Sequence, residues 1–177
     1  DVPKSSKRER NARNGFGRPL KLKLDAKVDA AMHPQWLSDW LRLGLPNWGT
    51  WAPYAGANAT PEQVADKMAE QTPIAVTWAH IEHFRKIWKG NLVLKGIMHP
   101  DDAMRALNIG CDGLMISNHG GRQLDRSPSP IEVLPAINAA VGDKMTLMLD
   151  SGVRRGSDVI AALCLGAKYV FCGRPTL

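Results

Sequence analysis

Short apolar runs alternate with amphipathic stretches in the chain from residue 74 onward. Four of the runs are too short for helices and end in glycine or polar residues, so they predict buried β-strands at 92–97, 113–117, 146–150 and 169–172. Apolar residues at helical spacing predict helices around them, over 78–88, 100–107, 131–141 and 157–165. Ser157 is the expected cap of the last helix, and Pro135 is expected to kink the third or to delay its start.

This alternation is typical of parallel βα units, in which each helix carries the chain back to the start of the next strand. The strands are apolar on both faces, as expected for parallel strands that are covered on both sides. A (β/α)₈ barrel needs roughly 200 residues or more, and this chain of 177 residues offers four clear strands. The predicted fold class is therefore α/β, the C-terminal portion of a TIM (β/α)₈ barrel with the N-terminal strands missing.

Residues 28–72 have a different pattern and hold four of the six tryptophans. A helix is predicted to start at Pro34, with Trp36, Trp40 and the neighbouring leucines on one face. A second, polar helix is predicted over 61–71. An amphipathic Trp-rich helix suits a membrane surface, but the same spacing suits packing on the protein's own core or on another subunit. The pattern leaves both possibilities open.

Positive charge is concentrated at the start of the chain. Residues 1–27 hold nine Lys or Arg against three Asp or Glu, whereas the remainder is neutral, so this segment carries the whole net charge of +6. We expect a polar basic loop here, able to meet anionic partners. It lacks interleaved aromatic residues and any nucleic-acid-binding motif, so no nucleic-acid partner is predicted.

Neither a targeting segment nor a cysteine-based site is predicted. The charged N-terminus does not resemble a signal peptide, and no run of about 18 apolar residues predicts a membrane span. Cys111, Cys164 and Cys172 lie in or beside apolar stretches without metal-ligand spacing. They are predicted to be reduced core residues of a cytoplasmic-type protein, and no metal site is predicted.

The segment 117–125, Ser-Asn-His-Gly-Gly-Arg-Gln-Leu-Asp, is the first candidate for chemistry. It follows the second predicted strand, and Gly120 and Gly121 allow a sharp turn between His119 and Arg122. Ligands bind at the carboxyl ends of parallel strands, which is where this titratable base and fixed cation are expected. The alternative is an ordinary glycine turn with a solvated His and Arg.

The loops after the third and fourth predicted strands also carry glycine and arginine. Gly152 and Arg154 follow the third strand, and Gly173 and Arg174 follow the fourth. Glycine backbone amides and an Arg fork bind phosphate at this position in many barrels, although two ordinary βα turns are the alternative. Lys95 interrupts the first strand, and a central barrel strand offers no edge to solvent, so Lys95 is expected to face the same cavity.

The motifs taken together resemble those of the FMN-dependent 2-hydroxy acid dehydrogenase and oxidase family. The matching blocks, in chain order, are Asp1-Val-Pro with Lys7-Arg-Glu9, Leu94-Lys-Gly96, the segment 117–125, Asp150-Ser-Gly-Val-Arg-Arg-Gly156 and Gly173-Arg-Pro175. The resemblance covers nearly the whole chain and is weakest over 20–72. It implies that 1–177 is part of an FMN hydroxy acid dehydrogenase domain, in which 28–72 is a Trp-rich insertion.

The resemblance also implies a role for each matching position. His119 is the implied base, Asp1 the carboxylate that stabilises its imidazolium, and Arg8 and Arg122 the clamp on the substrate carboxylate. Lys95 is the implied cation beside the flavin ring, and Ser117 an implied hydrogen-bond partner of the flavin. The implied contacts to the ribityl chain and phosphate come from Asp150, Ser151, Gly152, Val153, Arg154, Gly173 and Arg174.

The implied activity is oxidation of an (S)-2-hydroxy acid of the lactate or mandelate type, with FMN as cofactor. Met32 to Trp36 is similar to membrane-associated family members, which implies a cytoplasmic protein peripheral on the inner face of the membrane, a membrane-associated electron acceptor and a homo-oligomer. Two alternatives stay open: a phosphosugar isomerase or lyase using the same phosphate site, and an inactive barrel fragment with a membrane or oligomerisation role.

Overall fold

The computed structural model describes residues 9, 13–15, 23–44, 47–71, 76–124 and 126–173. The chain divides into two compact units, which are described separately. One comprises Lys7–Ile74 and is called the helical unit here; the other, called the sheet unit, comprises Asp1–Ser6 and Ala75–Leu177.

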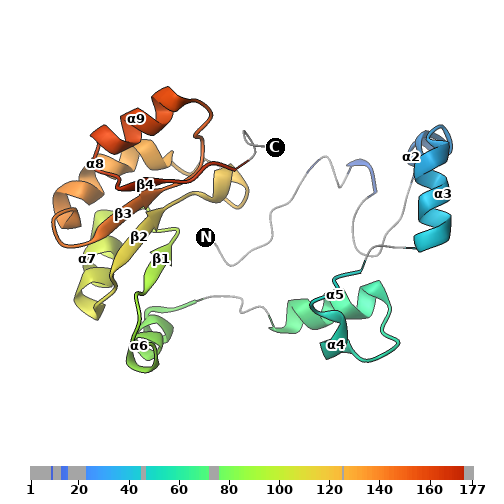
Figure 1. Cartoon of the computed structure of the whole chain (residues 1–177), viewed down its shortest axis with the longest axis horizontal. Helices are drawn as coiled ribbons and strands as arrows, with labels where there is room; N and C mark the ends of the chain where they lie inside the picture. The colour runs from blue at the N-terminus through green and yellow to red at the C-terminus, as the bar shows by residue number, and fades with distance from the viewer. Residues whose placement is uncertain are drawn as a thin grey trace. The chain divides into compact units, whose positions relative to one another are not determined.

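A parallel four-stranded sheet forms the centre of the sheet unit (Figure 1). Its strands are adjacent in chain order: β1 (Val93–Lys95), β2 (Gly113–Ile116), β3 (Thr146–Leu149) and β4 (Tyr169–Val170). All four predicted strands are confirmed, but each is shorter than its apolar run. The run after β1, for example, turns away at Gly96, whose φ of 90° is incompatible with a strand.

Each strand is preceded by a helix, as the alternation predicted. The helices are α6 (Trp78–Ile87), α7 (Pro100–Ile109), α8 (Pro130–Val141) and α9 (Gly156–Cys164). Helix α8 includes Pro135 and begins before it, so the expected late start is wrong. Ser157 does not cap α9, because the helix already begins at Gly156 and the Asp158 carboxylate accepts hydrogen bonds from the amides of Arg154 and Arg155.

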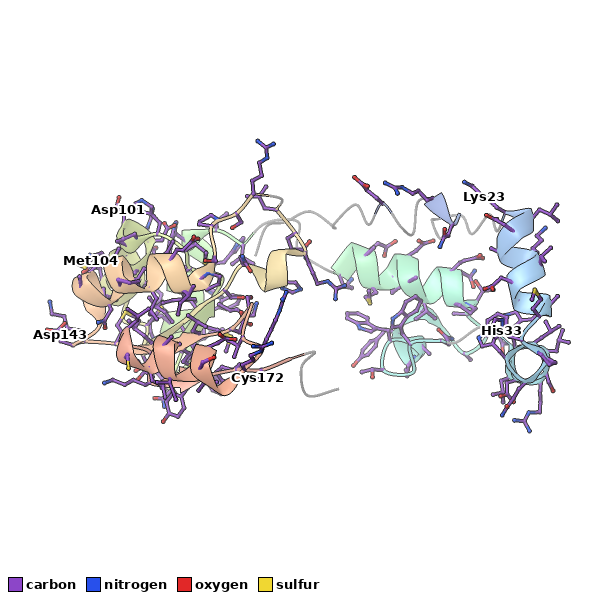
Figure 2. All side chains as sticks on the ribbon, turned by 90° about the horizontal axis from the view of Figure 1, so that it is seen from above. Lys23, His33, Asp101, Met104, Asp143 and Cys172 are labelled. Carbon is purple, nitrogen blue, oxygen red and sulfur yellow. The ribbon has the colours of Figure 1, made fainter. Side chains whose placement is uncertain are left out.

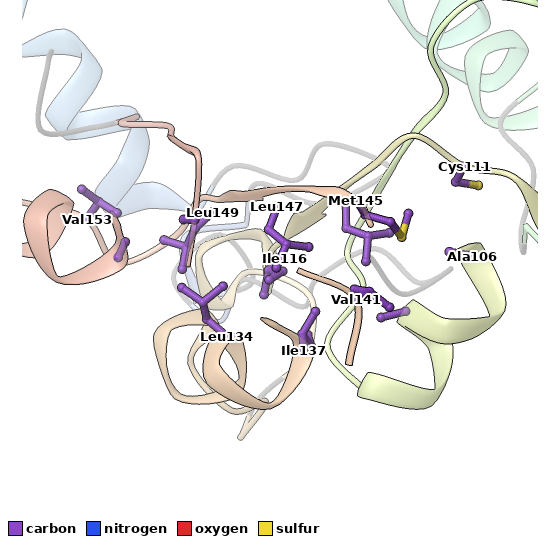
Figure 3. Packing of buried hydrophobic residues seen from close by; sticks show 14 residues of the cluster. Ala106, Cys111, Ile116, Leu134, Ile137, Val141, Met145, Leu147, Leu149 and Val153 are labelled. Atoms are coloured by element: carbon purple, nitrogen blue, oxygen red, sulfur yellow. The ribbon is translucent and has the colours of Figure 1, made fainter. Parts of the chain in front are cut away.

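The core lies between one face of the sheet and the helices (Figure 3). Leu114, Ile116, Leu147 and Leu149 alternate along β2 and β3 and are fully or almost fully buried against α8 residues such as Leu134, Ile137 and Val141. In the register of the sheet, Lys95, Met115, Met148 and Tyr169 form the row on the opposite face. None of these four is fully buried, so among the described residues only one face of the sheet is covered, not both as expected.

The cysteines divide between core and surface. Cys111 belongs to the core, and its burial raises the pKa of its thiol. Cys164 and Cys172 are exposed, so the prediction that all three are core residues is wrong for these two. Figure 2 shows Cys172 beyond the carboxyl end of the sheet and Asp143 at the opposite end of the unit.

The helical unit contains α2 (Leu24–Ala31), α3 (Pro34–Leu43), α4 (Ala52–Ala55) and α5 (Pro61–Gln71). The predicted start of α3 at Pro34 and both predicted ends of α5 are confirmed. Helix α2, which follows its N-cap Lys23 (Figure 2), begins inside the segment predicted as a loop. Only α5 buries apolar side chains completely among these helices, namely Val64 and Ala65.

No helix among the described residues has the length and apolar character needed to cross a membrane.

Candidate functional site

A cavity of about 900 Å³ opens at the carboxyl ends of the four strands. Residues predicted for the site from three different loops line it together with Lys95 at the end of β1. His119 and Arg122 come from the loop after β2, and further predicted residues, Asp150, Ser151, Gly152, Val153, Arg154 and Gly173, follow β3 and β4. The structure therefore brings the histidine, the lysine and arginine side chains and the glycine loops to one cavity.

The turn His119–Gly121, a short 3₁₀ helix named η1, has its three amides bound by side-chain oxygens. The His119 amide donates to Ser117 Oγ at 3.1 Å, the Gly120 amide to Ser151 Oγ at 2.8 Å, and the Gly121 amide to Asn118 Oδ1 at 3.1 Å. His119 itself has a φ of 58°, which residues with a Cβ seldom adopt. The imidazole is thus presented by a turn that is fixed at every amide.

Lys95 points into a polar environment, as predicted. Its Nζ donates to Ser117 Oγ at 2.9 Å and lies 3.8 Å from Asp150 Oδ2. In the described sheet, the strand that carries it has β2 as its neighbour. The ammonium group faces the cavity because Ser117 and Asp150, at the ends of β2 and β3, hold it there.

Ser117 lies behind the cavity wall and does not line it. Its side chain is almost completely buried, at 1% exposure, and its Oγ serves both Lys95 and the His119 amide. Its predicted contact with a flavin stays a prediction. What the structure assigns to Ser117 is a link between the lysine and the histidine turn.

The loop between β3 and α9 combines open backbone with positive charge. A Cβ built on Gly152 would meet no atom within 4 Å, and the same holds for Gly173 after β4. Arg154 lines the cavity beside them. The backbone amides of Arg154 and Arg155 are occupied by Asp158, and these two hydrogen bonds hold the pKa of that carboxyl below its usual value.

Sequence reasoning assigned no site role to five residues that line the cavity. They lie within or beside the predicted motifs or at the start of α8: Asn118, Ser129, Pro130, Phe171 and Cys172. Asn118 has a visible task, because its Nδ2 donates to the Pro128 carbonyl at 3.1 Å while its Oδ1 accepts from Gly121. An asparagine shortly before two glycines, as in Asn118-His-Gly-Gly121, is a turn signal that could have identified this role.

Three predicted site residues, Asp1, Arg8 and Arg174, lie outside the described residues. Among the residues that the structure describes, no three His, Cys, Asp or Glu side chains gather in a way that would hold a metal ion.

Comparison with known proteins identifies the family of this chain. The family model of FMN-dependent dehydrogenases matches residues 1–177. The FMN-dependent alpha-hydroxy acid dehydrogenase qulF of Penicillium citrinum is 61% identical over 101 residues, which are 57% of this chain and 25% of that protein. The L-lactate dehydrogenase of Caulobacter vibrioides is 40% identical over 175 residues, covering 98% of this chain and 45% of that protein.

A solved structure agrees with these sequence matches. The crystal structure of the monotopic membrane protein (S)-mandelate dehydrogenase superposes with a TM-score of 0.85 at 36% identity, over 99% of this chain and 46% of that one. The chain spans less than half the length of each of these three proteins. The four βα units are accordingly a part of a (β/α)₈ barrel, and the chain belongs to the FMN-dependent dehydrogenase family, within the 2-hydroxy acid dehydrogenases.

Proposed function

We propose that the natural full-length protein oxidises an (S)-2-hydroxy acid to the 2-oxo acid with FMN as cofactor. One observation carries the proposal: a single cavity at the carboxyl ends of the strands holds His119, Arg122, Lys95 and two glycine loops in a chain of this family. A base, a carboxylate clamp and a cation beside an electron acceptor are the groups that the reaction requires.

The residues present fit FMN. The cavity volume of about 900 Å³ lies within the range of ligand pockets, roughly 300–1,000 Å³. The backbone at Gly152 and Gly173 is open to close approach, and Arg154 adds a guanidinium that suits a phosphate. Because Asp158 occupies the amides of Arg154 and Arg155, we assign the phosphate to the glycine loops and arginine and not to these two amides.

The reaction removes two electrons and two protons from the substrate, and FMN supplies the electron-accepting group when it is bound. His119 accepts a proton on its imidazole, which in the neutral form is a suitable base near neutral pH. The Arg122 guanidinium binds the substrate carboxylate and so orients the carbon that is oxidised. Lys95, held by Ser117 and Asp150, places a positive charge on the β1 side of the cavity.

Residues outside the described part complete the proposed site. Arg8 is the second half of the carboxylate clamp, Asp1 the carboxylate that stabilises the imidazolium, and Arg174 a further phosphate contact. The other proposed flavin contacts are Ser117, Asp150, Ser151 and Val153. The substrate is proposed to be of the lactate or mandelate type, because proteins of both names resemble nearly the whole chain.

The experiment is anaerobic reduction of the full-length, FMN-loaded protein. The loss of the yellow flavin absorbance measures the reduction. (S)-Mandelate, L-lactate and glycolate are added separately, and the rate constants rank the substrates. We expect reduction by an (S)-hydroxy acid, with (R)-mandelate as the control that leaves the colour. A protein that carries no flavin and binds a phosphosugar would support the isomerase or lyase alternative instead.

A membrane role is proposed for the Trp-rich segment 28–72. Trp36, Trp40, Leu41 and Leu43 of α3 are exposed, and the similar solved enzyme is described as monotopic. This supports peripheral attachment at the inner face of the membrane and a membrane-associated electron acceptor. Deleting 27–56 from the full-length protein should release it from membranes, and unchanged sedimentation with membranes would contradict this. A homo-oligomer remains part of the proposal.

A further inference from the structure

Ser151 has an unusual backbone for a residue with a side chain. Its φ is 76°, in the left-handed region that glycine occupies far more easily, and Gly152 follows with a φ of 79°. Serine is therefore an unfavourable choice for the conformation alone. An outlier of this kind next to a ligand cavity calls for a compensating interaction or a function.

The Ser151 hydroxyl supplies that interaction by bonding on two sides. It donates to Asp150 Oδ1 at 2.7 Å and accepts from the Gly120 amide at 2.8 Å. Gly120 is 31 positions earlier in the chain, in the turn that follows β2. One hydroxyl therefore connects the loop after β3 with the turn that carries His119.

The other two amides of this turn are bound from within their own loop. Ser117 Oγ accepts a hydrogen bond from the His119 amide, and Asn118 Oδ1 accepts one from the Gly121 amide. Both acceptors lie just before the turn. They fix the shape of the turn but not its place relative to β3. The Gly120–Ser151 bond is the contact among the three that fixes this placement.

The bond also closes a ring of contacts around the cavity. Lys95 binds Ser117, Ser117 binds the His119 amide, Gly120 binds Ser151, and Ser151 binds Asp150, whose other oxygen faces Lys95 at 3.8 Å. The ends of β1, β2 and β3 are thereby joined through side chains. Without Ser151 Oγ the ring is open at the histidine turn.

We infer that Ser151 is a positioning residue. It holds the His119 turn against the β3 loop and so keeps the imidazole at a fixed position relative to the cofactor side of the cavity. The inference rests on the proposed function for its catalytic consequence. It differs from the ribityl or phosphate contact assigned to Ser151 above, because it acts through the backbone of Gly120. The two roles can be separated by experiment.

Glycine is the most informative replacement. Ser151→Gly removes the hydroxyl and relieves the positive φ, whereas Ser151→Ala removes the hydroxyl and keeps the strain. If Ser151 had only a structural role, the glycine variant should match the wild type in the rate constant of flavin reduction. A positioning serine predicts that both variants lose the same function, since both lack the bond to Gly120. Ser157→Ala, an exposed serine in the first turn of α9, is the matched control.

The test uses the full-length protein loaded with FMN and three readouts. Hydrogen exchange at the Gly120 amide should accelerate about tenfold in both Ser151 variants, the value expected for loss of one hydrogen bond. The rate constant of flavin reduction at saturating hydroxy acid should fall about 10- to 100-fold, as for a displaced catalytic group. For a residue that acts through Gly120, the FMN dissociation constant should stay within about threefold of the wild type, because Gly152, Arg154 and Gly173 keep their proposed contacts with the phosphate. A larger loss of affinity is what the ribityl or phosphate contact proposed above for Ser151 predicts. Ser157→Ala should change none of these.

Two results would overturn the inference. Unchanged exchange at Gly120 would show that Ser151 does not hold the turn. A weaker FMN affinity with an unchanged reduction rate in the loaded variants would show that Ser151 acts on the cofactor. Failure of the proposed function has its own signature, a wild-type flavin that no hydroxy acid reduces; the catalytic consequence then fails, and hydrogen exchange still decides whether Ser151 fixes the turn.

Discussion

The sheet unit and the helical unit treat their apolar side chains in opposite ways. In the sheet unit, leucines and isoleucines from strands and helices converge on one core, and Leu134 and Ile116 are fully buried. In the helical unit, α2 and α3 bury no residue completely, and Trp36 and Leu41 keep 55% and 69% of their surface exposed. Amphipathic helices occur in both, so helical periodicity alone does not create a core.

The difference lies in what each helix can pack against. A parallel sheet offers every helix a continuous apolar surface, and the same sheet gathers the loop residues at its carboxyl ends. Among the described residues of the helical unit, no sheet offers α3 such a surface, although its two tryptophans stack on each other with ring centres 6.4 Å apart. The sheet unit therefore gathers a candidate site, whereas α3 of the helical unit leaves large apolar side chains exposed.

The largest expected effect contrasts one leucine from each unit. Leu134→Ala should lower the free energy of unfolding by about 2–5 kcal/mol, because it leaves a cavity in a closed core. Leu41→Ala removes the same atoms from an exposed position and should change it by less than about 0.5 kcal/mol. Urea denaturation of the two variants measures both values. Equal losses would mean that Leu41 is buried and that the contrast between the units is false.

A second prediction concerns the exposed face of α3. The double variant Trp36→Ser/Trp40→Ser should bind anionic lipid vesicles at least about tenfold more weakly, because the amphipathic surface loses its largest apolar groups. Its urea midpoint should stay near that of the wild type. Gln35→Ala, a polar position of the same helix, is the control in a vesicle co-sedimentation assay. Undiminished vesicle binding by the double variant would refute the membrane role of this face.

The smallest expected effect concerns the loop before α9 and depends on pH. Hydrogen bonds from the amides of Arg154 and Arg155 lower the pKa of Asp158 below its ordinary value of 3.8. The folded state therefore prefers the carboxylate, and its stabilising contribution is complete above the ordinary pKa and disappears as the pH falls through the lowered one. Asp158→Ala should be less stable than the wild type at neutral pH, and the difference should shrink in acid. Thermal melts at both pH values test this, and a difference that grows in acid would contradict it.

Periodicity and turn residues sufficed to predict the sheet and the place of the site. The four apolar runs became strands β1 to β4, and the polar residues that follow them line one cavity, because the carboxyl ends of parallel strands share one edge. Family motifs supplied the roles of individual residues, which remain proposals. The starts of α3 and α5 were also predictable, since proline begins each helix.

Long-range hydrogen bonds could not be predicted from local pattern. Nothing near Ser151 in the sequence indicates that its hydroxyl binds Gly120, and nothing near Ser117 shows that it is buried behind Lys95. Helix α2 was missed because only Leu24 and Val28 give it an apolar periodicity, among lysines and aspartates. The cap of α9 was missed because the helix begins one residue before Ser157, with Arg155 as its N-cap. Asp158, in the third helical position, accepts the hydrogen bond from the Arg155 amide.

The central claim is that His119 is the base of a flavin-dependent oxidation in the cavity at the strand ends. The most direct measurement is the rate constant of anaerobic flavin reduction by a saturating (S)-hydroxy acid in full-length, FMN-loaded protein. His119→Gln should lower it by a factor of about 10²–10⁴, the usual contribution of a general base, while FMN stays bound. His83→Gln, an exposed histidine on α6, should leave it unchanged. Reduction at the wild-type rate in His119→Gln would contradict the account.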